Sequence, residues 1–230
     1  MVGDVYAAVS PTFSWYKLVH RSCRLSPMDR PKFLCGQHLT VKRTALRVTM
    51  QEAVRATGDW RVLVHSHWRD IVWGQFGAAI DSLERAMVAC PERVWSDRSL
   101  NPEFWYVTFH TLFWLDYYLS DSIEGFAPPA PFTLDELDPA GIIPERPYTK
   151  AELQSYLDHC RAKCRKMMEG LTEEKAREHR KWSIEGTVAE LYLYNMRHVQ
   201  HHTAQLNLIL RQQIDSAPSW VSRTPIKLGG

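Results

Sequence analysis

A segment with six prolines, residues 120–148, separates two pairs of helix-like patterns in this chain. So many prolines exclude a helix there, because proline lacks the backbone N–H and its ring clashes with the preceding turn. The segment is also long for a connection within a compact domain, where about 4–6 residues are usual. In a bundle, such a segment crosses from one end to the other, so that the helices on either side lie parallel. The sequence therefore predicts an all-α fold, a four-helix bundle with a long crossover between its second and third helices.

The expected helices cover residues 60–88, 101–119, 149–168 and 187–212. Capping boxes, in which two side chains satisfy each other's backbone N–H groups, begin the third and fourth helices. These boxes pair Thr149 with Glu152 and Thr187 with Glu190. Asn101 before a proline indicates the N-cap of the second helix. The connector at 171–186 has a mixed character, and strand patterns are negligible.

Charge divides the chain into a basic extension and a slightly acidic domain. Residues 1–49 hold eight basic and two acidic side chains, in a chain of net charge +2. Three interpretations of this stretch stay open: a disordered basic arm, a transit-like peptide, or translated sequence upstream of the true start. We expect the bundle at 50–214 and an irregular tail at 215–230. Because the bundle lacks a basic stripe, binding to nucleic acid is not expected.

Composition restricts the cellular setting and the class of site. The five cysteines are scattered and form no CxxC motif, which favours reduced thiols and a cytoplasmic location. No apolar run approaches the ~20 residues of a membrane span. The sequence also lacks the HExxH motif of metalloproteases and the glycine-rich motifs that bind phosphates. A soluble, cytoplasmic protein that does not contact membranes is the expectation.

Three histidines predict a metal site inside the bundle. His198 and His202 lie one helical turn apart on the face that is expected to turn inward. His110 lies in the middle of the aromatic second helix, where an unpaired imidazole would be costly to bury. A metal ion that is held by three imidazoles and keeps open coordination positions is typical of a catalytic rather than a structural site. The alternative is a set of core histidines satisfied by hydrogen bonds, and His201 is the rival of His202.

The segments His110-Thr-Leu-Phe-Trp-Leu-Asp-Tyr-Tyr-Leu119 and His198-Val-Gln-His-His202-Thr-Ala-Gln-Leu206 resemble the DinB-like family of four-helix bundles. The resemblance covers about Trp60 to Gln212. It implies an up-down-down-up bundle that often dimerises, in which His110, His198 and His202 bind a divalent metal, zinc or nickel in many members. Some members are transferases or isomerases that depend on a low-molecular-weight thiol. The extension at 1–49 is not part of the family pattern.

Two functional hypotheses follow. In the first, the metal activates a small thiol for attack on an electrophile, which would make the protein a thiol S-transferase. The candidate substrate pocket comprises Trp68, Trp114, Tyr117 and Arg197. In the second, the protein is a non-catalytic metal-binding or stress-associated bundle. Neither Asp116 nor Glu190 falls on the inward face beside the histidines, so no general base is recognisable and a hydrolase is disfavoured.

Overall fold

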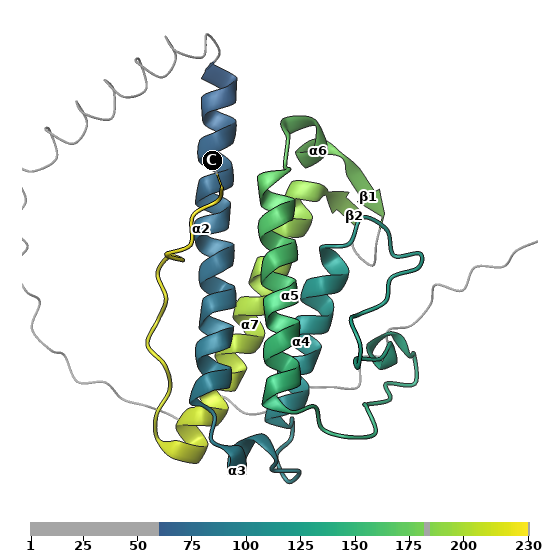
Figure 1. The fold of residues 1–230 in the computed structure, drawn as a ribbon, viewed down its shortest axis with the longest axis vertical. Coiled ribbons are helices and arrows are strands. Elements are labelled where there is room, and N and C mark those ends of the chain that lie inside the picture. Colours follow the sequence, from purple (N-terminus) through teal and green to yellow (C-terminus); the bar gives the residue numbers. More distant parts are fainter. Residues whose placement is uncertain (1–59, 182–184, 230) are drawn as a thin grey trace, which may run out of the picture. The chain divides into compact units, whose positions relative to one another are not determined.

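Four long helices account for most of the structure, a computed structural model that describes residues 60–181 and 185–229. They are α2 (Trp60–Ala89), α4 (Phe104–Tyr118), α5 (Lys150–Glu169) and α7 (Val188–Ile214), labelled as in Figure 1. The prediction of an all-α fold is confirmed. The proposed extension at 1–49 lies outside the described residues.

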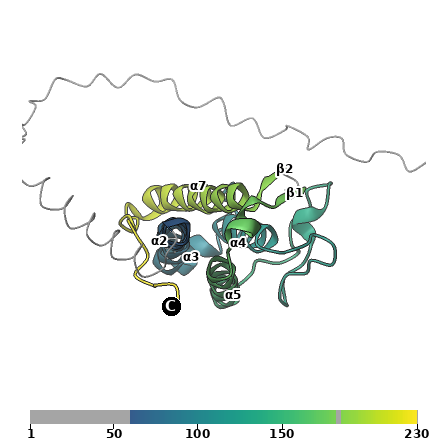
Figure 2. The same ribbon diagram turned by 90° about the horizontal axis from the view of Figure 1, so that it is seen from above.

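The four helices share one apolar core. Helices α5 and α7 each pack against both α2 and α4, which Figure 2 shows from above. Fully buried side chains come from every helix, among them Phe76, Ile80, Trp105, Phe109, Tyr156 and Leu206. Burial of such side chains stabilises each by roughly 1.5–3 kcal/mol relative to exposure. The aromatic second helix is buried on several sides, as its composition predicts.

Both predicted capping boxes are present. The hydroxyl of Thr149 accepts from the backbone N–H of Glu152, while the Glu152 side chain accepts from the backbone N–H of Thr149. Thr187 and Glu190 make the same exchange at the start of α7. These boxes satisfy backbone donors that the first turn of a helix leaves unpaired.

The predicted start of the second helix is wrong. The N-cap of α4 is Glu103, and Asn101 precedes the helix. The Glu103 side chain does not cap the helix, because it accepts a hydrogen bond from Trp105 Nε1 and pairs with Arg98. The helix therefore begins after Glu103 without a side-chain cap.

Short elements that the sequence did not predict connect the long helices. They are α3 (Glu92–Trp95), the 3₁₀ helix η1 (Asp135–Leu137), α6 (Glu173–Arg177), β1 (His179–Lys181) and β2 (Glu185–Thr187). The two strands form an antiparallel hairpin in which His179 faces Thr187. The hairpin lies directly before α7, and η1 lies within the proline-rich crossover.

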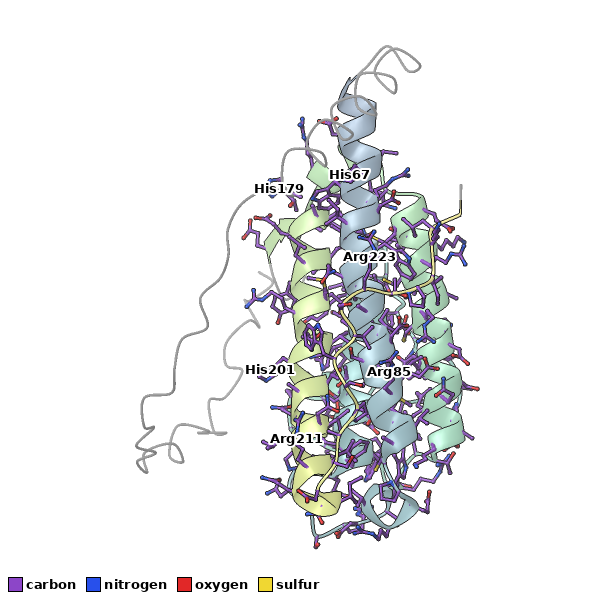
Figure 3. All side chains as sticks on the ribbon, turned by 90° about the vertical axis from the view of Figure 1, so that its left-hand side faces the viewer. His67, Arg85, His179, His201, Arg211 and Arg223 are labelled. Atoms are coloured by element: carbon purple, nitrogen blue, oxygen red, sulfur yellow. The ribbon has the colours of Figure 1, made fainter. Side chains whose placement is uncertain are left out.

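The C-terminal residues 215–229 contain no helix or strand and run along α2 (Figure 1). The backbone N–H of Thr224 donates to the carbonyl of Gly74, and Trp73 Nε1 donates to the carbonyl of Ile226. A Cβ at Gly77 would lie 2.5 Å from the Cγ2 atom of Thr224, so glycine at this position permits the close approach. Figure 3 shows Arg223 where the tail crosses α2.

None of the helices in the described part of the chain combines the length and apolar character that a membrane span requires.

Candidate metal centre

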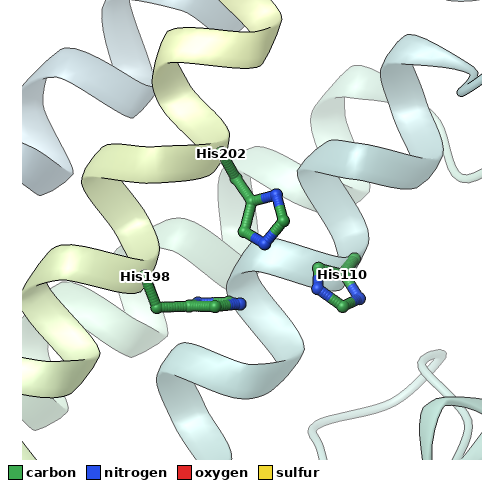
Figure 4. A group of neighbouring side chains, drawn as sticks. All are labelled: His110, His198 and His202. Carbon is green, nitrogen blue, oxygen red and sulfur yellow. The ribbon is translucent and has the colours of Figure 1, made fainter. Parts of the chain in front are cut away.

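Three histidines from two helices converge at one point between α4 and α7. His110 comes from the middle of α4, and His198 and His202 come from consecutive turns of α7. One ring nitrogen from each histidine lies within 4.8 Å of those of the other two. Figure 4 shows the three rings facing a shared space. It is the one group of three or more metal-ligating side chains at such distances among the described residues.

Hydrogen bonds fix the orientation of two of the three imidazole rings. The Nδ1 atom of His110 lies 2.7 Å from Glu136 Oε2, and the Nδ1 atom of His202 lies 2.7 Å from Gln205 Oε1. Both partners are acceptors, so each Nδ1 carries the proton and donates. The Nε2 lone pairs of His110 and His202 are therefore available to a metal ion, as in metal sites whose ligands are held by outer hydrogen bonds. The Nδ1 atom of His198 is buried and has no hydrogen-bond partner among the residues that the structure describes.

Glu136 was not predicted from the sequence. It belongs to η1 in the crossover, and its side chain is only 5% exposed. Its Oε2 atom accepts hydrogen bonds from His110 and from Trp114 Nε1, 2.9 Å away, and Tyr106 also hydrogen-bonds to it. Burial alone would raise the pKa of Glu136. The hydrogen bonds and the interaction with His110 outweigh burial, so the pKa is lowered and the carboxylate is ionised at neutral pH.

A signal for Glu136 does exist in the sequence, although it does not identify the residue. Tyr106, His110 and Trp114 follow one another at intervals of four residues, so their O–H and N–H donors share one face of α4. Donors on an otherwise apolar helix need an acceptor when they are buried. The pattern therefore predicts an acceptor from another element, but not which acidic residue supplies it.

The histidines of α7 are neutral at neutral pH. Burial lowers the pKa of His198 to about 2, with further lowering by the neighbouring His202 and His110. Burial also lowers the pKa of His202 to about 4, and the neighbouring His110 adds to this, while its hydrogen bond to Gln205 opposes the shift. Neutral imidazole is the form that binds metal. No proton therefore has to leave these two rings before they can act as ligands at pH 7.

The cluster is accessible from one side, and aromatic rings surround it. The side chain of His110 is 29% exposed. Its ring centroid lies 6.3 Å from that of Trp114, and the ring of Tyr118 lies 6.3 Å from that of His198. These rings place an apolar wall beside the three ring nitrogens, which suits an apolar substrate.

The other candidates for the pocket lie at different distances from the histidines. Tyr117 stacks on Phe113 and contacts Trp114, one layer away from the cluster. Trp68 is partly buried against the core, and no described contact joins it to the three histidines. Arg197 follows Leu193 and Tyr194 along a neighbouring face of α7 and lines a hollow there.

Other side chains of metal-binding type in the described part of the chain, including the predicted rival His201, do not join the cluster. His201 is exposed, and Figure 3 shows it on the outer side of α7. Cys160 and Cys164 are fully buried in the core, while the neighbouring His159 contacts Asp116. The acidic residues Asp116 and Glu190 are also engaged away from the histidines, Asp116 with Lys163 and Glu190 in the cap of α7.

A bundle of helices with three convergent imidazoles, one of them 29% exposed, defines a helical protein with a candidate metal centre. The model of the DinB superfamily matches residues 75–206, which include all three histidines and Glu136. The chain belongs to the DinB superfamily. No curated protein and no solved structure matches it.

Proposed function

We propose that this protein binds a divalent metal ion through His110, His198 and His202 and is a metal-dependent transferase that activates a low-molecular-weight thiol. The observation that carries the proposal is the convergence of three ring nitrogens, two of them on rings whose other nitrogen is already engaged. Imidazole-rich sites accept zinc and nickel, the two metals we favour. A bound ion would lower the pKa of a thiol or water in its open position.

The residues of the chain have separate tasks in this proposal. The three histidines hold the ion and leave its exposed side free. Glu136 and Gln205 keep the rings of His110 and His202 in one tautomer and one orientation. Trp114 and Tyr118 form the apolar wall against which an electrophile binds and from which water is excluded.

The sulfur nucleophile would come from a small molecule, because the described cysteines are unsuited to the role. Burial raises the pKa of the Cys90 thiol to about 12 and also raises the pKa of Cys160 and Cys164. Thiols, unlike thiolates, are poor nucleophiles. In the proposed reaction the sulfur of the external thiol bonds to an electrophilic carbon and its proton passes to water. The leaving group departs with the bonding electron pair.

A second candidate function is metal binding without catalysis. The observation that favours it concerns Glu136, the carboxylate that contacts the cluster within the described residues. Its Oε2 atom is already occupied by His110 and Trp114. This carboxylate therefore serves to orient His110, and a role in metal storage or stress protection needs no acid–base group.

An assay with thiols and electrophiles separates the two candidates. Glutathione, bacillithiol, mycothiol and coenzyme A would be tested with an aryl halide and an epoxide, using zinc-loaded and nickel-loaded protein. The transferase proposal expects turnover that disappears in His110→Ala and persists in His201→Ala. Tight metal binding without turnover across the panel would favour the non-catalytic function.

The proposal extends to helix order, assembly and location. The packing of α5 and α7 against both α2 and α4, and the long crossover, support an up-down-down-up bundle. Leu208 in the second half of α7 is 54% exposed, which supports a homodimer that covers this part of the helix. We place the protein in the cytoplasm. Light scattering of the purified protein tests the assembly, since a monomer at micromolar concentration would refute the dimer.

A further inference from the structure

A hollow of about 360 Å³ lies between the β hairpin and the first half of α7, next to the histidine cluster. Arg180, Glu185 and Gly186 line it from the hairpin. Helix α7 contributes Glu190, Leu191, Leu193, Tyr194 and Arg197. The lining therefore combines an apolar floor with two arginines and two glutamates, and neither the family match nor the proposed metal site accounts for it.

Aromatic rings connect this hollow with the cluster. The ring of Tyr194 lies 5.4 Å from that of Tyr118, which in turn lies 6.3 Å from the ring of His198. Trp114 extends the same wall, with its ring 5.5 Å from that of Tyr118. Tyr194 and His198 are four residues, or slightly more than one helical turn, apart, about 6 Å along the axis of α7. Because Tyr194 is 37% exposed and Tyr118 only 6%, the apolar surface that leads from the hollow towards His198 is formed by Tyr194.

Two charged residues of the hollow, Arg197 and Glu185, form no ion pair with a described residue, and Arg197 is the one cation of the two. Arg180 donates to the backbone carbonyl of Asp121 at 2.9 Å and pairs with the Asp121 and Glu178 carboxylates. Glu190 is occupied by the cap of α7, where hydrogen bonds from Thr187 lower its pKa. Arg197 is exposed and has no hydrogen bond or ion pair with any residue that the structure describes.

We propose that this hollow binds the carboxylate of a small apolar substrate, with Arg197 as its anchor. The guanidinium group presents a planar set of donors that matches a carboxylate. The apolar body of the substrate lies along Leu193 and Tyr194, and its reactive end extends towards His198, one helical turn from Tyr194. The position of the substrate's reactive end rests on the proposed function, whereas binding of its carboxylate by Arg197 does not.

Calorimetric titration of the zinc-loaded, full-length protein with 3-phenylpropionate and its neutral amide tests the proposal. The matched control is Arg211→Gln, because Arg211 is exposed on the same helix, far from the hairpin that His179 marks in Figure 3. The wild type is expected to bind the acid about tenfold more tightly than the amide. Arg197→Gln should reduce this preference to about twofold or less, and Arg211→Gln should retain it.

Three results would overturn the proposal. Equal binding of the two probes to the wild type would show that the hollow does not recognise a carboxylate. An unchanged preference in Arg197→Gln would place the carboxylate elsewhere, for example on the zinc ion. A similar loss in Arg211→Gln would show that the preference reflects only the overall charge of the protein.

A kinetic comparison separates this proposal from the proposed function and identifies which substrate carries the carboxylate. If the protein prefers the acid in an Arg197-dependent way but transfers no thiol, carboxylate binding in the hollow is supported and the transferase function is refuted. The opposite result is turnover whose KM is the same in the wild type and in Arg197→Gln, for carboxylated thiols and carboxylated electrophiles alike. It would refute substrate binding in the hollow and would support the transferase proposal. A rise in KM for one of these two classes would identify it as the ligand.

Discussion

The Nδ1 atom of His110 lies 2.7 Å from the Oε2 atom of Glu136, so the crossover between α4 and α5 determines the tautomer of a candidate metal ligand. This contact gives the long proline-rich segment a function beyond connecting two helices. It brings a negative charge to the ring that faces the proposed ion, and such a charge raises the basicity of the ligand.

Glu136→Gln should weaken zinc binding by about tenfold, because the neutral amide still accepts a hydrogen bond but contributes no charge. Competition with a chromophoric chelator measures the change in affinity. Glu145→Gln is the matched control, since Glu145 lies in the same crossover and is exposed. Equal affinities of Glu136→Gln and the wild type would show that Glu136 only supports the loop.

The sequence identified the three histidines but not the residues that orient them. His198 and His202 are predictable because helical periodicity relates residues four positions apart. Glu136 is not predictable, since it comes from an irregular segment whose path depends on packing. The same limit applies to Tyr118 and Tyr194, which meet only because α4 and α7 lie side by side.

Lys163→Met should destabilise the protein by about 2–3 kcal/mol, because it removes the ammonium group from the buried carboxylate of Asp116 and leaves it with Tyr156 and His159. Asp116 is 1% exposed, and Lys163 Nζ contacts its Oδ1 atom at 2.5 Å. Urea denaturation measures the loss. Lys166→Met, an exposed position on the same helix, should change stability by about 0.5 kcal/mol or less. Adding Asp116→Asn should recover part of the loss, and no recovery would contradict the explanation.

Gly77→Ala should detach the C-terminal tail from α2. The new Cβ would lie 2.5 Å from the Cγ2 atom and 2.8 Å from the Cβ atom of Thr224, so the tail must shift. Faster tryptic cleavage after Arg223 would report the detachment. Gly170→Ala is the control, because its Cβ would meet nothing closer than 3.5 Å. Cleavage at the wild-type rate in Gly77→Ala would show that the tail accommodates a methyl group.

Cys90, Cys160 and Cys164 should resist alkylation by iodoacetamide in the native protein at pH 8. With its pKa raised to about 12 by burial, Cys90 has roughly one thiol in ten thousand ionised at this pH. The labelling of Cys90 should rise with pH as long as the fold persists. Peptide mass spectrometry measures labelling at each site, with urea-unfolded protein as the fully reactive reference. Rapid native labelling of Cys90 would contradict the assigned environment.

The long helices were predictable, whereas the short elements between them were not. Thr149 and Thr187 begin α5 and α7 as expected, because capping boxes are local features of the sequence. The strands of the hairpin have only three residues each, too few to show an alternating pattern. The start of α4 was misplaced because Glu103 is engaged with Arg98 and Trp105, contacts that no local rule anticipates.

Metal content, measured by elemental mass spectrometry after incubation with zinc or nickel, tests the central claim most directly. The wild type should hold about one ion per chain, and His110→Ala and His202→Ala should hold almost none. His201→Ala should bind as the wild type does, because its side chain is exposed beside the cluster and outside it. A wild type without metal after both incubations would instead identify His110, His198 and His202 as core histidines.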